Sequence, residues 1–154
     1  MNTDTSLSAL VNHLIDTSDT ILLGRKTTDE FTSYWESVTS SSQDYEFAAK
    51  MIRTPKIVFS KMLKSVKGQN VRVENGPLVD TVTLLKNLPG KDILVYGGAT
   101  FASSLIETQL IDELHFFVNP VAIGQGKRIF AQRTALSLAN SVACPSGVVV
   151  NSYA

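Results

Sequence analysis

The apolar positions of this chain fall into two spacings, which predict alternating helices and strands. Between residues 7 and 15 they recur every three or four positions, as on one face of a helix. Short continuous apolar runs, such as 20–23 and 93–96, are typical of strands covered on both faces. The predicted strands are 20–23, 56–60, 71–74, 93–96, 113–121, 136–143 and 147–153. The predicted helices are 7–15, the segment after 24–27 that carries Phe31 and Trp35, 45–53, 78–88, and the segment from Gly98 to Thr108.

Strands and helices alternate as far as residue 121, which predicts right-handed crossovers and a mostly parallel sheet. The last three strands are joined without full helices, and Pro145-Ser146-Gly147 provides a hairpin connection between the final two. We therefore expect a three-layer α/β fold in a single domain spanning residues 1–154. The C-terminal hairpin is expected to add antiparallel edge strands to the sheet.

The composition limits the kinds of ligand or partner that we expect this protein to bind. The 154 residues are enough for one domain with a substantial core, and 44% of them are hydrophobic. Lys plus Arg and Asp plus Glu both total 14, so the net charge gives no reason to expect a nucleic acid or a membrane surface as partner. His13 and His115 lack metal-ligand spacing, and no apolar run reaches membrane-spanning length. We expect a cytoplasmic protein that acts on a small molecule and holds no metal.

Three predicted strands end in residues that suit phosphate binding. Gly24-Arg25-Lys26-Thr27 follows the first strand, Ser60-Lys61 follows the second apolar run, and Gly97-Gly98 follows the run 93–96. The carboxyl ends of parallel strands form the ligand crevice of an open sheet, so these residues are expected at one edge. Cations and hydroxyls suit a phosphate monoester, and a glycine pair that opens a helix suits a pyrophosphate. For each cation taken alone, a solvated surface charge is the alternative interpretation.

Four motifs follow one another along the chain. They are Thr20 to Thr27, Ser60-Lys61, Val95 to Thr100, and Asp112-Glu113-Leu114 with Asn119 to Gly126. In this order they resemble the dihydrofolate reductase-like family, and more closely its riboflavin-biosynthesis reductase branch, the RibD C-terminal domain. The resemblance extends from about Asp16 to the end of the chain, and it implies a three-layer dihydrofolate reductase-like fold with a mostly parallel sheet.

The resemblance also implies an NADPH-dependent reductase that transfers a hydride to a pteridine-like or ribosylaminopyrimidine-type substrate. By position, the cofactor would contact the three strand-end motifs. The adenosine phosphate or pyrophosphate would meet Gly24, Arg25, Lys26 and Thr27, the 2′-phosphate would meet Ser60 and Lys61, and the pyrophosphate would meet Gly97, Gly98, Ala99 and Thr100.

The substrate half of the site is less well defined by the sequence. The resemblance implies that Phe31 and Trp35 line the substrate pocket, and packing in the core of an amphipathic helix is the alternative for both. The family opens with a strand carrying a Ser-x-Asp-Gly-like stretch beside the nicotinamide, and this sequence has no such strand. No catalytic residue is therefore assigned. Asp4 and Glu30 are the nearest candidate acids, for which a helix cap and an exposed charge are the expected roles.

A second functional hypothesis is a nucleotide-binding or assembly module that keeps the fold without turnover. It is favoured by the absence of the family's first strand, which would lie between 93–96 and 113–121. Without it, the two strands could close onto each other, a partner chain could donate a strand, or the sequence could be a fragment. The fragment interpretation is favoured, and a hydrogen-bonded ladder between 92–96 and 113–121 would contradict it. The amount of strand at this side of the sheet also leads us to expect a homodimer.

Overall fold

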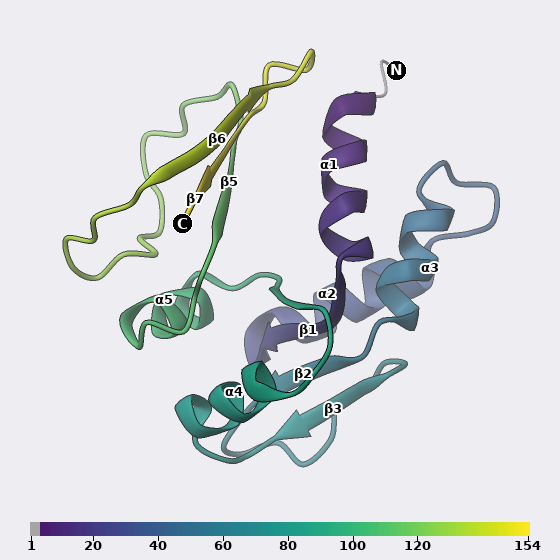
Figure 1. Ribbon diagram of the computed structural model, residues 1–154. Helices are drawn as coiled ribbons and strands as arrows, with labels where there is room; N and C mark the ends of the chain where they lie inside the picture. Colours follow the sequence, from purple (N-terminus) through teal and green to yellow (C-terminus); the bar gives the residue numbers. More distant parts are fainter. Residues whose placement is uncertain (1–3) are drawn as a thin grey trace.

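A computed structural model describes residues 4–154. A four-stranded sheet is built from strands between residues 18 and 95 (Figure 1). The order and type of the elements agree with those predicted from the sequence. The strands of this sheet are β1 (Ser18–Gly24), β2 (Lys56–Phe59), β3 (Val71–Glu74) and β4 (Asp92–Val95). The helices are α1 (Thr5–Asp16), α2 (Arg25–Ser37), α3 (Tyr45–Arg53), α4 (Leu78–Asn87) and α5 (Ala99–Glu107).

The strand order in this sheet is β3-β2-β1-β4, and all three ladders are parallel. From β1 the chain therefore moves outward through β2 to β3, and then returns to the opposite side of β1 as β4. The carboxyl ends of all four strands lie at one edge of the sheet. The direction of winding reverses between β1 and β4, and such a switch point is where open α/β sheets form a ligand crevice.

Helices cover both faces of the sheet, as the three-layer expectation requires. Because side chains alternate along a strand, Ile21 and Leu23 of β1 face one side and Leu22 faces the other. The first side packs against α1, α2 and α3, and the second against α4 and α5. Helical residues buried on the first side are Ile15, Phe31 and Met51, and those on the second side are Val82 and Leu105.

The last three strands form a separate antiparallel sheet in the order β5-β7-β6. They are β5 (Leu114–Val118), β6 (Leu138–Ala143) and β7 (Val149–Tyr153). The C-terminal hairpin forms as predicted, but the expectation that it adds strands to the parallel sheet is wrong. Strand β7 pairs with β5, and no ladder within residues 4–154 joins β5 to the parallel sheet. No ladder joins β4 to β5 within residues 4–154, so the alternative in which these two strands close onto each other is also wrong.

Helix α1 contacts the cores of both sheets (Figure 1). Its end, at Ile15, is buried in the core of the parallel sheet, whereas Leu7 and Leu10 pack against Val150 and its neighbours in the antiparallel sheet. Asp4 caps the helix by accepting a hydrogen bond from the Leu7 N–H at 3.1 Å. Among the described residues, none of the helices combines the length and apolar character needed to cross a bilayer.

The ammonium of Lys56 is buried beneath the carboxyl end of α3. Its Nζ donates to the carbonyl oxygens of Met51, Ile52 and Thr54 at 2.8, 3.0 and 2.8 Å. These carbonyls lie at or just beyond the last turn of the helix, where they lack helical partners. Burial lowers the pKa of Lys56 to about 8, and the charge of Glu36 acts in the opposite direction.

This pKa makes the stability of the fold depend on pH. Between pH 8 and about 10.5 the unfolded chain binds more protons than the folded chain, so the free energy of unfolding should rise with pH by about 2 kcal/mol. Lys56→Met removes the titrating group, so the variant should lack this rise. The free energy of unfolding of the wild type minus that of the variant should therefore increase from pH 8 to about 10.5. Urea unfolding of both proteins from pH 7 to pH 10 measures it. A difference that does not change with pH would contradict the assignment.

Candidate functional site

Two helices begin at the switch point between β1 and β4. Helix α2 starts directly after β1, with Gly24 as its N-cap. Three residues separate β4 from α5, and the last of them, Gly98, is the N-cap of α5. Neither helix has a side-chain cap among the described residues. The N–H groups of both first turns are therefore available to a ligand, and both helix dipoles place their positive ends here.

The glycine pair after β4 has a conformation and a setting that strongly disfavour other residues. Gly97 and Gly98 have φ angles of +92° and +78°, which L side chains rarely adopt. A Cβ at Gly97 would lie 2.8 Å from Cγ2 of Thr27, and one at Gly98 would lie 3.1 Å from Oγ1 of the same residue. The α2 start and the glycine pair are thus in direct contact. The first turn of α5 also lies close to the end of β1, because a Cβ at Gly24 would lie 2.8 Å from Cβ of Phe101.

Ser60 and Lys61 lie beside this point, one strand away from β1. Phe59, the last residue of β2, is in register with Gly24, so Ser60 directly follows the strand end. The Ser60 hydroxyl accepts hydrogen bonds from the N–H groups of Met62 and Leu63 at 3.2 and 3.0 Å. It therefore shapes the turn that presents the exposed Lys61 side chain.

Asn75 holds the same turn from the next strand, and the sequence interpretation did not single it out. Its side-chain amide donates to the carbonyl oxygens of Ser60 and Leu63. The only sequence signal was its place in an Asn-Gly-Pro turn. Arg25 and Lys26 project from the first turn of α2 and are exposed, and Thr100 is exposed in the first turn of α5. The structure thus gathers the predicted cofactor residues along the carboxyl edge of β2, β1 and β4.

The two residues predicted to line the substrate pocket lie in a core cluster. Phe31 is 6% exposed and contacts Tyr96 with ring centroids 5.0 Å apart. Trp35 is half-buried and contacts Phe47, with ring centroids at 5.1 Å. Both side chains therefore pack as the core alternative describes, and their substrate role remains a prediction. Tyr96 connects this cluster to the switch point, and burial raises the pKa of its hydroxyl, with a further contribution from Tyr34.

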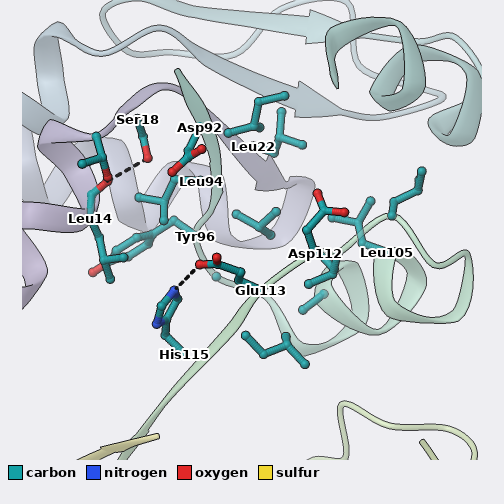
Figure 2. Close-up of a pocket in the computed structure, with 18 of the residues that line it drawn as sticks. Leu14, Ser18, Leu22, Asp92, Leu94, Tyr96, Leu105, Asp112, Glu113 and His115 are labelled. Carbon is teal, nitrogen blue, oxygen red and sulfur yellow. Dashed lines mark hydrogen bonds and ion pairs between the residues drawn. The ribbon is translucent and has the colours of Figure 1, made fainter. Parts of the chain in front are cut away.

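A cavity of about 710 Å³ separates β4 from β5, and we call it the interstrand cavity. Of the predicted site residues only Gly97 lines it. Figure 2 shows Leu94 and Tyr96 on the β4 side, and Glu113 and His115 on the β5 side. The His115 ring bonds Ser152 Oγ through Nδ1 at 2.8 Å, and its Nε2 lies 3.4 Å from Glu113. The sequence interpretation gave His115 no role.

The two candidate acids have the structural roles that were expected for them. Besides capping α1, Asp4 accepts a hydrogen bond from the Ser146 N–H at 2.9 Å, and hydrogen bonds to Ser146 lower its pKa. Glu30 is exposed on α2. Neither residue lines the interstrand cavity, and within residues 4–154 no cluster of His, Cys, Asp and Glu is arranged to hold a metal ion.

Comparison with known proteins matches residues 2–150 to the RibD C-terminal domain family. The chain belongs to this family. It is 32% identical over 152 residues to the protein YyaP of Bacillus subtilis (strain 168), described as uncharacterized, and the match covers 97% of this chain and 78% of that protein. The resemblance inferred from the strand-end motifs is thereby confirmed.

Solved structures of RibD-type proteins share the fold. A putative riboflavin biosynthesis protein from Shewanella sp. PV-4 superposes with a TM-score of 0.71 at 23% identity, covering 99% of this chain and 80% of that one. A pyrimidine reductase-like protein from Corynebacterium diphtheriae superposes with a TM-score of 0.66 at 16% identity, covering 98% and 81%. These similarities confirm the dihydrofolate reductase-like fold class.

Proposed function

We propose that this protein is an NADPH-dependent reductase that transfers a hydride to a pteridine-like or ribosylaminopyrimidine-type substrate. The observation that carries the proposal is the meeting of two uncapped helix N-termini at the switch point of the sheet. The first turns of α2 and α5 converge on the glycine pair Gly97-Gly98, which adjoins the side chain of Thr27. Such a site favours an anion with several phosphate oxygens.

The residues present fit the two charged parts of NADPH. The N–H groups after Gly98 and those of the first turn of α2 would hold the pyrophosphate, with Arg25 beside it. The exposed ammonium of Lys61, on the turn shaped by Ser60, would meet the adenosine 2′-phosphate. Ammonium and guanidinium groups suit these phosphates because their hydrogen bonds are charge-assisted.

The chain's own contribution to the reaction is binding and orientation. NADPH supplies the hydride when bound, and the protein positions it. The close contact between Thr27 and the glycine pair fixes the spacing of the two helix starts, and therefore where a pyrophosphate can sit. Tyr96 directly precedes the glycines, and its ring packs against Phe31 of α2 with ring centroids 5.0 Å apart, which connects the glycine turn to the core.

The relatives support a reductase as the reaction class. The family is named for the C-terminal domain of RibD, and one structural neighbour is described as pyrimidine reductase-like. A second candidate function is a nucleotide-binding module without turnover. It is favoured by the separation of β4 from β5, because the cavity between them adjoins Gly97 and leaves the region beyond the glycines open.

A titration followed by an activity assay tests both candidates. NADPH fluorescence is expected to change saturably on addition of the protein, and oxidation of NADPH is expected in the presence of a ribosylaminopyrimidine or a pterin. Saturable binding without oxidation of NADPH by any substrate of these classes would favour the binding module. Absence of any NADPH binding would contradict both.

A further inference from the structure

Asn75, which holds the turn carrying Lys61, lies in a sequence context that favours chemical modification. It is the only asparagine in the sequence that is followed by glycine. In such a pair the main-chain nitrogen of the glycine can attack the side-chain carbonyl carbon of the asparagine, because glycine has no Cβ to hinder closure of the ring. Asn75 and Gly76 are both exposed, so water has access to them.

The structure places a carboxylate beside the attacking nitrogen. The Gly76 N–H donates a hydrogen bond to Glu74 Oε1 at 3.4 Å. The other oxygen of this carboxylate pairs with the Arg72 guanidinium at 2.9 Å. The Glu74 side chain is therefore oriented by Arg72, and from this position it can accept the amide proton as the nitrogen attacks.

The side-chain amide of Asn75 closes the turn after β2. Its Nδ2 donates to the carbonyl oxygen of Leu63 at 2.7 Å and to that of Ser60. These two bonds use both N–H groups of the amide. From within the turn, the Ser60 hydroxyl accepts the N–H groups of Met62 and Leu63. The conformation of residues 60–63 therefore depends on the group that deamidation removes.

We propose that Asn75 is a site of spontaneous deamidation, and that its modification opens the turn that carries Lys61. The bond between Gly76 N and Asn75 Cγ forms, the bond between Cγ and Nδ2 breaks, and Nδ2 leaves as ammonia. The proton of the Gly76 amide passes to Glu74 and from there to the leaving nitrogen. Water then opens the cyclic imide at either of its carbonyls, which gives aspartate or isoaspartate. Water is the only co-reactant.

The hydrogen bonds of Asn75 also determine when the modification occurs. While both bonds to the turn are formed, they restrain the side chain. Local opening of an exposed turn releases it, and such opening is fast compared with closure of the imide ring. Once the amide has been lost, the same bonds cannot form again. Deamidation thus converts a transient opening into a lasting one.

Either product would destabilise the closed turn. A carboxylate has no N–H to donate, and its oxygens would face the carbonyl oxygens of Ser60 and Leu63. Isoaspartate would also lengthen the main chain directly after β3. The consequence for the cofactor rests on the proposed function. An open turn with a negative charge added beside it would no longer present the Lys61 ammonium to the 2′-phosphate of NADPH.

Peptide mass analysis of the 154-residue protein, incubated in mildly alkaline buffer, tests the modification itself. The conversion of an amide to an acid should be at least about tenfold faster at Asn75 than at Asn140, which is exposed and followed by serine. Gly76→Ala keeps Asn75 and its acceptors, and should slow the conversion about tenfold because its Cβ hinders ring closure. That Cβ would lie 3.2 Å from the side-chain oxygens of Glu74 and Thr81, which can move.

Trypsin cleavage tests the opening of the turn without any cofactor. Asn75→Asp reproduces the aspartate product. Cleavage after Lys61 should be about tenfold faster in this variant than in the wild type, because two hydrogen bonds of the closed turn are lost. Cleavage after Lys127, an exposed lysine between β5 and β6, should be unchanged. The variant should also lose most of the preference for NADPH over NADH while binding NADH as before.

Two results would overturn the proposal. The first is conversion of Asn75 that is no faster than that of Asn140, or that Gly76→Ala does not slow. The second is equal cleavage after Lys61 in Asn75→Asp and the wild type, which would show that the amide does not hold the turn. Absence of NADPH binding by the wild type would instead contradict the proposed function, and the mass and trypsin measurements would still decide this inference.

Discussion

Gly98→Val is expected to weaken NADPH binding about a hundredfold. The substitution places a branched side chain at the N-cap of α5, where the pyrophosphate must approach the main chain. Loss of two charge-assisted hydrogen bonds, at about 1.5–3 kcal/mol each, is sufficient for this effect. The positive φ at this position adds a stability cost of roughly 1–3 kcal/mol, so the fold must be checked by circular dichroism alongside the titration.

Gly124 offers a matched control for the backbone strain. Its φ is +75°, close to the +78° of Gly98, and a Cβ there would meet no atom within 4 Å. Gly124→Val should therefore lower stability through strain while NADPH affinity is unchanged. If Gly98→Val bound NADPH as tightly as wild type, or if Gly124→Val lost affinity equally, the glycine pair would not be the phosphate site.

The second large effect expected is a preference for NADPH over NADH that depends on Lys61. Only NADPH carries the 2′-phosphate, and a charge-assisted contact to it contributes about 1.5–3 kcal/mol, or roughly 10- to 150-fold in affinity. Lys61→Ala should lose most of this preference while leaving NADH binding nearly unchanged. Arg25→Ala should weaken both cofactors, since its predicted contact is with the pyrophosphate that they share.

Fluorescence titration of both cofactors with each variant measures the preference. Lys127→Ala, an exposed lysine between β5 and β6, controls for the loss of one positive charge. Raising the salt concentration should reduce the preference of the wild type, because exposed ion pairs are screened. Equal affinities of the wild type for NADPH and NADH would rule out the assignment of Lys61.

Much of the fold was predictable because the apolar pattern of each segment agrees with its tertiary environment. The run at 20–23 is apolar on both faces because β1 is the central strand, with Leu22 facing α4 and α5 and its neighbours facing α1, α2 and α3. The separation of the sheets was not predictable from periodicity. A strand such as β5 carries the same local pattern whichever sheet it joins, and only its pairing with β7 decides between them.

The candidate site, like the fold, was predictable from the sequence only in part. The glycines at 97 and 98 were recognisable because a positive φ at a strand-to-helix turn nearly requires glycine. The hydroxyl of Ser60 was predicted to bind phosphate, and the structure shows instead that it accepts two main-chain N–H groups, so the phosphate role remains a prediction. Asn75 lies 15 residues from Ser60 in sequence, and such a long-range contact leaves no local signal.

The bridging position of α1 has a consequence for the order of folding. The parallel sheet is built from residues 18–95, whereas the bond between Asp4 and Ser146 joins positions 142 residues apart. Closing so long a loop is entropically costly and slow compared with the nearer contacts among β1, β2 and β3. During synthesis, Leu7 and Leu10 can therefore pack against Val148 and Val150 only after the final hairpin has been made. Until then, the amino-terminal helix exposes an apolar stripe that a chaperone could bind.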